Sequence, residues 1–273
     1  MKYGLMMLFG AYAVIVLAVY LGQHRLLYLP EPSEAPDVVL ERTALTPWPA
    51  SAFVGYLSPT PDDVKGTVLV FHGNAGAAWH RSHYSDALYR LGYRVLLVEY
   101  PGYGGRQGRV GQSAFTQDGL VVIKQVEAQF SGPVFLWGES LGAAVVASIV
   151  AQLPADNRVR GVVLMAPWDS LTALAKHHYW YLPVSLLLND AYDSMANLKD
   201  FHHPVAVLVA GQDRIIPNEH SLNLFESLTE PKALWQFSDA SHNHWPYQPE
   251  ADWWAEVMAF VSKGIPDPVN RVN

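Results

Sequence analysis

Short apolar runs recur along most of this chain, and longer segments with helical character separate them. Runs rich in Val, Leu and Phe predict buried strands at residues 67–71, 94–98, 134–137, 161–165 and 205–210, with a last short strand at 233–237. The intervening segments predict helices at residues 79–91, 114–130, 140–153 and 218–228. Because parallel strands need crossover connections, this alternation predicts an α/β fold with a mostly parallel central sheet and helices on both faces.

In sheets of this kind, ligands bind at the carboxyl ends of the strands, so the residues after each strand are the candidates for function. After the first three strands the chain reads HGNAGAA, EYPGYGGRQG and GESLG. After the last three it reads APWDS, GQDRIIP and SDASHNHW. Polar residues and glycines are therefore concentrated at one edge of the predicted sheet.

The stretch GESLG places two polar residues, Glu139 and Ser140, between an apolar strand and an apolar helix. It fits the GxSxG elbow, in which a nucleophilic serine occupies a sharp strand-to-helix turn with glycine two residues to either side. The start of the helix would aim the backbone amide of Leu141 at a developing oxyanion. In the alternative interpretation, the turn faces solvent and Ser140 only caps the helix.

A serine nucleophile needs a base and an acid, and in the elbow fold the chain order is serine, acid, histidine. Asp213 and His242 satisfy this order at strand ends, and we predict them as the acid and the base. His244 is the alternative base and Asp169 the alternative acid, while Asp213 could instead cap the following helix. The two closely spaced histidines also raise the question of a metal, but neither cysteine nor an HExxH motif accompanies them, so no metal is expected.

The glycine-rich loop HGNAG is expected to supply a second oxyanion donor. It offers backbone amides at Asn74 and Ala75, and its glycines let the chain pass close to a substrate. His72 precedes the serine in the chain and therefore fits a loop-fixing role better than the role of base. The other histidines show no metal-ligand spacing, so surface or packing roles are expected for His80, His83, His177, His178, His202, His203 and His220.

Composition restricts the remaining functional classes. The 273 residues carry a net charge of -7, which argues against a nucleic-acid partner, and 50% are hydrophobic, which fits one globular core. The absence of cysteine excludes disulfides, thiolate metal sites and a cysteine nucleophile. The loop GYGGRQG has Gln107 where a dinucleotide-binding GxGxxG motif needs its last glycine, so no nucleotide is expected and no cofactor is predicted.

The first residues form a separate pattern. Residues 4–22 carry no charge, and at about 1.5 Å per residue they roughly span the hydrocarbon core of a bilayer. Tyr20 and Leu21 stand where a cleavage site needs small residues, so residues 1–25 predict an uncleaved single-pass membrane anchor rather than a cleaved signal peptide. A lone N-terminal anchor commonly leaves the rest of the chain on the non-cytoplasmic side. The Pro-rich residues 26–50 predict an extended linker and the entry to the domain.

In this order, the motifs HGNAG, GYG, GESLG, GQDRIIP and SHNHW resemble those of the α/β-hydrolase superfamily, and more narrowly of its bud-emergence-type branch of membrane-anchored serine hydrolases. The similarity runs from about residue 57 to residue 260. It implies an α/β-hydrolase fold with Ser140 as nucleophile, Asp213 as acid and His242 as base. It also implies an oxyanion hole formed by the amides of Asn74 and Leu141.

The chain departs from that branch at two positions. Pro101 precedes GYG where an arginine is common, and His244 stands where an aspartate is common. Both departures concern the rim of the expected pocket, and hence substrate preference. They leave the pattern of the triad intact.

These observations predict a serine hydrolase domain at residues 51–273 that cleaves carboxylic esters or thioesters of small or lipid-like acyl substrates through an acyl-enzyme. Residues 168–203 are too long for a simple crossover, and their aromatic residues form either a lid over an acyl pocket or an ordinary packed excursion. A serine peptidase or acyltransferase with the same triad is an alternative. A non-catalytic membrane-tethered binding protein of the same fold is another.

Overall fold

An eight-stranded sheet runs through residues 2–263, the part of the chain that the computed structural model describes. Its order is β10-β9-β8-β7-β4-β6-β3-β2, and it is parallel except where β3 pairs with β6 and with β2. The strands are β2 (Thr46–Trp48), β3 (Gly55–Leu57), β4 (Gly66–Phe71), β6 (Tyr93–Val98), β7 (Val134–Glu139), β8 (Val159–Met165), β9 (Val205–Ala210) and β10 (Lys232–Phe237). The predicted fold class, a mostly parallel sheet with helices on both faces, is confirmed.

Most of the predicted strands are buried along their whole length. In β4, β6, β7 and β9 every residue is buried, which agrees with their near-continuous apolar sequences, because helices cover both faces of a parallel sheet. The antiparallel edge strands β2 and β3 were not predicted. They have three residues each, and β2 contains Pro47, which is typical of edge strands and weakens the sequence signal.

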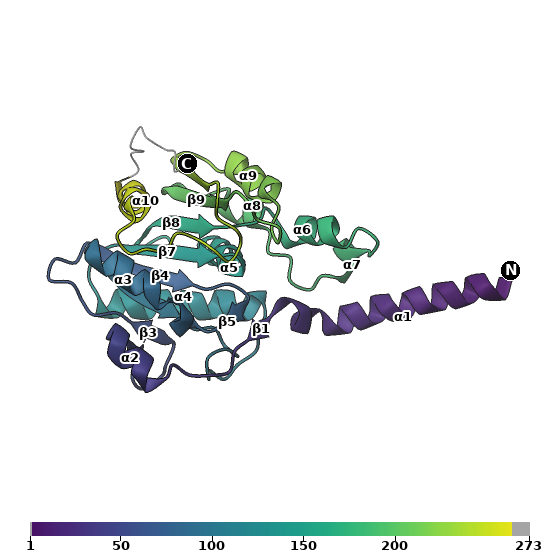
Figure 1. The fold of residues 1–273 in the computed structure, drawn as a ribbon, viewed down its shortest axis with the longest axis horizontal. Coiled ribbons are helices and arrows are strands. Elements are labelled where there is room, and N and C mark those ends of the chain that lie inside the picture. Colours follow the sequence, from purple (N-terminus) through teal and green to yellow (C-terminus); the bar gives the residue numbers. More distant parts are fainter. Residues whose placement is uncertain (1, 264–273) are drawn as a thin grey trace.

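Two layers of helices enclose the sheet (Figure 1). One core packs the sheet against α4 (Gln112–Gln129), α5 (Leu141–Val150) and α9 (Asn218–Ser227). The other core packs its opposite face against α3 (Ser82–Arg90) and α10 (Asp252–Lys263). The predicted helix 79–91 begins as a short 3₁₀ turn, η1 (Ala78–Arg81), and the sequence analysis had assigned no element to α10.

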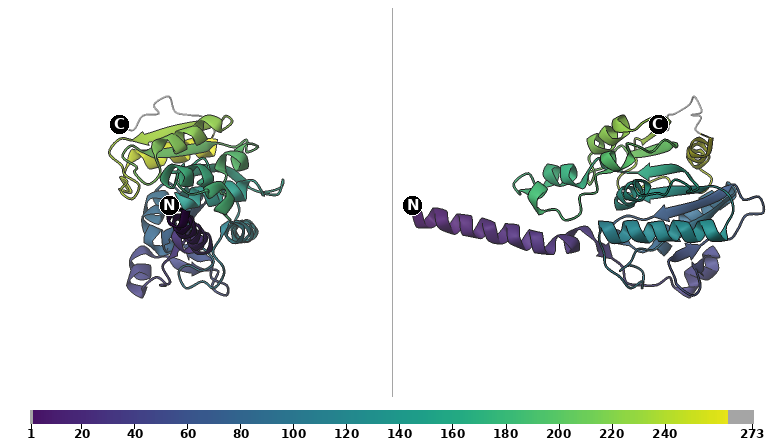
Figure 2. Two further views of the ribbon diagram at one scale, coloured as in Figure 1. Left: turned by 90° about the vertical axis from the view of Figure 1, so that its right-hand side faces the viewer. Right: turned by 180° about the vertical axis from the view of Figure 1, so that it is seen from behind.

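The N-terminal segment lies apart from these layers. The helix α1 (Lys2–Leu27) projects from the body as a long rod, and it is long and apolar enough to cross a membrane (Figures 1 and 2). Beyond it, β1 (Leu29–Pro30) pairs in parallel with β5 (Ala75–Gly76), inside the predicted oxyanion loop. Within residues 26–50, predicted as an extended linker and the entry to the domain, the structure has α2 (Asp37–Thr43) and the sheet strand β2.

The long excursion between β8 and β9 carries three short helices, α6 (Leu171–His178), α7 (Val184–Leu187) and α8 (Ser194–Leu198). Figure 1 and the rear view in Figure 2 show α6 and α7 reaching out from the body beside α1. Hydrogen bonds join the two segments. The Tyr12 hydroxyl donates to the Tyr181 carbonyl at 2.7 Å, and the Gln23 side-chain amide donates to the Leu187 carbonyl at 3.0 Å.

The aromatic contacts of α10 generate a stability prediction. The Trp254 ring stacks on Trp253 with ring centroids 3.9 Å apart, and the residue is 1% exposed. Trp254→Ala should lower the free energy of unfolding by about 3–5 kcal/mol, because it leaves a cavity in a closely packed core. Urea unfolding followed by circular dichroism measures this loss. Trp180→Ala, at a residue 82% exposed, is the control and should change stability by less than about 0.5 kcal/mol. Equal losses in the two variants would contradict this packing.

Candidate active site

Ser140 occupies the turn between β7 and α5 in a strained conformation. Its φ is 52° and its ψ is -112°, a region that non-glycine residues seldom adopt. The turn is closed so tightly that a Cβ on Gly138 would lie 2.4 Å from the carbonyl oxygen of Gly142. The Ser140 side chain makes no capping hydrogen bond to α5, so the alternative interpretation of Ser140 as a helix cap does not describe this turn.

The three side chains predicted to act together do lie in one hydrogen-bonded chain. The Ser140 Oγ is 3.0 Å from His242 Nε2, and His242 Nδ1 is 2.7 Å from Asp213 Oδ2. The Asp213 side chain is nearly inaccessible to solvent, and its other oxygen accepts from the backbone amides of Ile215 and Ile216. Because a carboxylate accepts hydrogen bonds, His242 donates from Nδ1 and presents the lone pair of Nε2 to the serine hydroxyl.

The competing acid and base have other partners. Asp169 Oδ1 lies 3.0 Å from His220 Nδ1, and His244 Nδ1 lies 3.3 Å from the hydroxyl of Ser241. The loop that carries His242 is fixed by Trp245, whose indole nitrogen donates to the His242 carbonyl at 3.0 Å. Of the candidates weighed in the sequence, Asp213 and His242 are thus the pair that reaches Ser140.

The predicted oxyanion residues line the same cavity as Ser140. This cavity has a volume of about 790 Å³, and Asn74, Ala75 and Leu141 are in its wall. Leu141 is the first residue of α5, so its amide has no acceptor within the helix. Asn74 is held from two sides, since its carbonyl accepts from the Leu29 amide at 2.9 Å and from the Tyr103 hydroxyl at 2.8 Å.

His72 supports this loop from beneath, as the sequence analysis expected. The residue is buried, its Nδ1 lies 2.8 Å from the Gly73 carbonyl, and its Nε2 lies 3.1 Å from Glu99 Oε1. The second oxygen of Glu99 accepts from the Ala78 amide at 2.9 Å. The strand-exit loop after β6 is thereby tied to the loop after β4.

Sequence reasoning missed the role of Glu139, the neighbour of Ser140. Its carboxylate accepts from Arg81 Nε at 2.8 Å and from the Tyr84 hydroxyl at 2.7 Å, and both Glu139 and Arg81 line the catalytic cavity. Burial would raise the pKa of Glu139, but the guanidinium of Arg81 outweighs burial and holds that pKa below its ordinary value. Burial also lowers the pKa of the neighbouring His83 to about 4. No local sequence pattern indicates the pairing of Glu139 with Arg81, because 58 residues separate the two.

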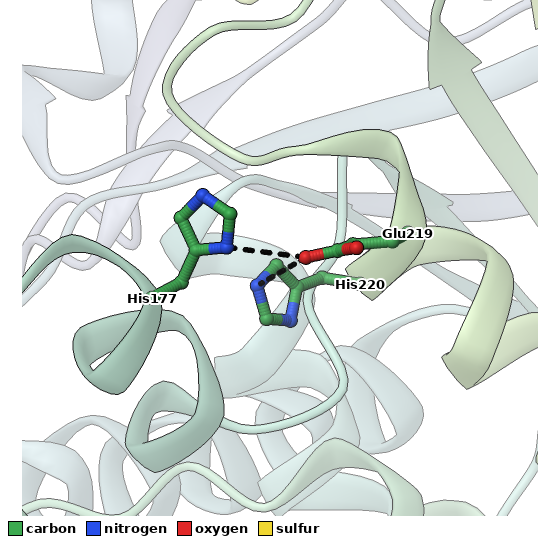
Figure 3. A group of neighbouring side chains, drawn as sticks. All are labelled: His177, Glu219 and His220. Atoms are coloured by element: carbon green, nitrogen blue, oxygen red, sulfur yellow. Dashed lines mark ion pairs between the residues drawn. The ribbon is translucent and has the colours of Figure 1, made fainter. Parts of the chain in front are cut away.

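A second cluster of polar side chains lies between α6 and α9 (Figure 3). It consists of His177, Glu219 and His220, whose nearest ligand-type atoms all lie within 4.8 Å of one another. His177 Nδ1 is 3.1 Å from Glu219 Oε1, and His220 Nε2 is 4.0 Å from the same oxygen. Within residues 2–263, this is the group with the composition and spacing to hold a metal ion.

Comparison with known proteins places the chain among enzymes of related sequence. Residues 62–182 match the family described as serine aminopeptidase, S33. An uncharacterised protein of Mycobacterium tuberculosis is 31% identical over 245 residues, which cover 84% of this chain and 83% of that one. The lysophosphatidylserine lipase ABHD12 of Danio rerio is 28% identical over 188 residues, covering 61% of this chain but only 48% of the lipase.

Solved structures agree at the level of the fold. An esterase of Pyrococcus furiosus superposes with a TM-score of 0.64 at 16% identity, covering 86% of this chain and 98% of that one. Est1E of Butyrivibrio proteoclasticus, solved with ferulic acid, gives a TM-score of 0.62 at 15% identity, covering 76% and 96%. Strand order, elbow and sequence similarity lead to one conclusion, which the motifs had already predicted: the chain belongs to the α/β-hydrolase superfamily.

Proposed function

We propose that this protein is a membrane-anchored serine hydrolase that cleaves carboxylic ester or thioester bonds of acyl substrates. The observation that carries the proposal is the hydrogen-bonded chain from Ser140 through His242 to Asp213 at the wall of a large cavity. Such a chain turns a weakly nucleophilic hydroxyl into an attacking group, because the proton has an acceptor already in place.

In the proposed mechanism, His242 Nε2 takes the proton of Ser140 while Oγ forms a bond to the substrate's carbonyl carbon. Asp213 stays ionised, orients the ring and stabilises the imidazolium. The imidazolium then gives its proton to the leaving oxygen or sulfur, and the acyl group remains on Ser140. A water molecule, deprotonated by His242, attacks this acyl-enzyme, and collapse of the second tetrahedral intermediate returns the proton to Ser140.

The negative charge of both tetrahedral intermediates would fall at the amides of Asn74 and Leu141. Loss of one such donor typically costs roughly 3 kcal/mol of transition-state stabilisation, so the position of the loop matters nearly as much as the triad. The packing beneath that loop supports the assignment. Asn74 is fixed through its carbonyl by Leu29 and Tyr103, which leaves its backbone little freedom to move away from Ser140.

A lipid-like substrate with a single acyl chain agrees best with the surroundings of the site. The cavity wall combines apolar side chains such as Met165, Trp168 and Leu174 with polar ones such as Arg214 and Asn243. This combination suits an ester that joins an apolar chain to a polar head. The related lipase named for lysophosphatidylserine, a lipid with one acyl chain, supports the same substrate class.

The helix α1 supports the proposed anchor. It has 26 residues and a mean hydropathy of 2.3 over its most apolar window, and none of it is buried inside the protein. A helix this apolar and this exposed is stable only with lipid or another apolar surface around it. We place the hydrolase domain on the non-cytoplasmic side, as a lone N-terminal anchor favours.

The matching family's description favours one second candidate, an aminopeptidase. Its matched residues end at 182, before Asp213 and His242, so the match includes the elbow but not the acid and the base. Aminoacyl p-nitroanilides assayed beside p-nitrophenyl esters separate the two activities. Acceptor alcohols added to the ester assay reveal acyl transfer, if there is any.

The triad prediction is tested with a fluorophosphonate, which reacts with activated serines. The full-length protein in detergent should label, and Ser140→Ala should abolish both the label and ester hydrolysis, with kcat/KM falling by about a thousandfold or more. Ser51→Ala, at an exposed serine away from the cavity, is the control and should keep both. His242→Ala should lower kcat/KM to a similar extent, whereas the kcat/KM of His244→Ala should stay within about threefold of wild type. A protein that never labels would be the non-catalytic binder.

The anchor prediction concerns the lipid-facing side of α1. Val14 and Leu17 are exposed on this helix, and an arginine near the centre of a membrane helix costs roughly 2.5–3.5 kcal/mol. Alkaline extraction should therefore leave the wild type in the membrane fraction and release the double variant Val14→Arg, Leu17→Arg. Val38→Arg, outside α1, should stay with the membrane.

A reporter fused to the C-terminus should be active on the non-cytoplasmic side, and activity only in the cytoplasm would refute that orientation.

A further inference from the structure

A second cavity lies between α1 and the excursion that carries α6 and α7. It has a volume of about 270 Å³, and we call it the anchor groove. Apolar side chains from both segments make up most of its wall, which comprises Ile15, Val19, Gln23, His24, Leu26, Leu27, Leu171, Ala175, Tyr179, Tyr181, Leu182, Val184, Leu187, Leu188 and Asp190. The groove thus has one wall on α1 and the other on the excursion between β8 and β9.

The anchor groove adjoins the catalytic cavity. Four residues line both, namely Leu27, Leu171, Ala175 and Tyr179. The side chains of these four residues therefore face both the side of α1 and the cavity in whose wall Ser140 lies. The polar residues Arg214 and Asn243 line the catalytic cavity alone, so the two neighbouring cavities differ in chemistry.

Hydrogen bonds fix the two walls of the groove relative to each other. Gln23 accepts from the Asn189 amide at 2.8 Å and donates to the Leu187 carbonyl at 3.0 Å. Asp190 accepts from the Tyr28 hydroxyl at 2.6 Å. Gln23 and Asp190 are thus paired with protein partners, while the third polar residue of the wall, His24, has its Nε2 3.3 Å from Asp190 Oδ2 and makes no hydrogen bond there. The rest of the surface offered to a ligand is apolar.

We propose that the anchor groove is the acyl-chain subsite of the enzyme. In this proposal the single acyl chain of the substrate enters the groove directly from the bilayer around α1. This proposal rests on the proposed hydrolase function. The ester would lie at Ser140 and the polar head in the part of the cavity lined by Arg214 and Asn243. One groove accommodates one chain, so the substrate class is a monoacyl amphiphile such as a lysophospholipid or a monoacylglycerol.

The test fills the groove without touching the catalytic cavity. Val19 lines only the groove, so Val19→Trp should block the acyl chain, and Val14→Trp, on the exposed side of the same helix, is the matched control. Soluble p-nitrophenyl esters from acetate to octanoate are the substrates. In wild type and in Val14→Trp, kcat/KM should rise with chain length, by up to about fourfold per buried methylene. In Val19→Trp, acetate hydrolysis should persist and the octanoate-to-acetate ratio should fall by about tenfold or more.

The outcomes separate this proposal from the one on which it rests. If wild type hydrolyses no ester and takes no fluorophosphonate label, the hydrolase function itself is wrong, and the subsite with it. If wild type hydrolyses esters but Val19→Trp keeps the wild-type chain-length profile, the groove is not the acyl subsite, whether it holds a structural lipid or another protein segment.

A long-chain fluorophosphonate with a terminal diazirine gives a second readout. Once attached to Ser140, it should crosslink to α1 or to residues 179–188, and crosslinks elsewhere would overturn the proposal.

The cluster in Figure 3 carries a second, independent inference. His220 is 5% exposed, and its Nε2 has no hydrogen-bond partner although it is buried. An unpaired buried nitrogen is costly unless something binds it. Its other nitrogen, Nδ1, lies 3.0 Å from Asp169 Oδ1, so the ring donates there and leaves the Nε2 lone pair facing Glu219 and His177.

We infer that His177, Glu219 and His220 form a zinc site, although the sequence analysis expected no metal. Two imidazoles and a carboxylate match the ligands that zinc prefers, and a carboxylate behind a ligating histidine is the usual orienting contact. His177 and Glu219 are exposed at the surface with His177 Nδ1 3.1 Å from Glu219 Oε1, while His220 supplies a buried ligand held by Asp169. The ion would join α6, on the excursion between β8 and β9, to α9, whose preceding loop holds Asp213.

Titration calorimetry of EDTA-treated full-length protein with zinc chloride tests this site. Wild type should bind one zinc ion per chain, and at about a hundredfold excess over Kd its melting temperature should rise by roughly 5–10 °C. Glu219→Gln and His177→Ala should each weaken binding by tenfold or more. Glu226→Gln, on the same helix, and His202→Ala are the matched controls and should bind as wild type does. Absence of zinc binding in the wild type, or binding that only His202→Ala removes, would overturn the assignment.

Discussion

The site depends on how closely the start of α5 crosses the end of β4. A Cβ on Gly142 would lie 2.0 Å from the carbonyl oxygen of Phe71, so no other residue fits there without moving one of the two elements. This approach leaves room for only a very sharp turn after β7, and Ser140 takes the strained positive φ that such a turn requires. The surrounding buried helix and strands keep Ser140 in this strained conformation. The conformation places the Ser140 hydroxyl 3.0 Å from His242 Nε2.

Local signals were enough to predict the centre of the sheet and the candidate triad. Buried parallel strands such as β4 and β9 are continuous apolar runs, and a GxSxG turn constrains the order of the acid and base that follow it. The features that sequence reasoning missed are set by tertiary contacts. The Glu139–Arg81 pair and the His177–His220 cluster join residues far apart in the chain, and the edge strands β2 and β3 are too short to show alternation. The division into domains stays a prediction, and the choice between a lid and a packed excursion at residues 168–203 stays open.

The N-terminal helix is connected to the candidate site, although it projects away from the body. The Asn74 side chain donates to the carbonyl of Leu27, the last residue of α1, and the Asn74 carbonyl accepts from Leu29 two residues later. Asn74, one of the two residues proposed for the oxyanion hole, is thus held by the end of α1, and the excursion that lines the cavity is hydrogen-bonded to the same helix. This arrangement agrees with the proposed route of the substrate along α1, because α1 forms part of the groove and also fixes the loop beside Ser140.

The central claim is that Ser140 carries the acyl group during turnover. Rapid quenching of the full-length protein during hydrolysis of p-nitrophenyl octanoate, followed by intact-mass analysis and peptide mapping, measures this directly. We expect one octanoyl group per chain, on Ser140 itself, formed in a burst of p-nitrophenol release and lost as the substrate is consumed. Turnover with the acyl group on another residue, or with no acylated protein and no effect of replacing Ser140, would contradict it.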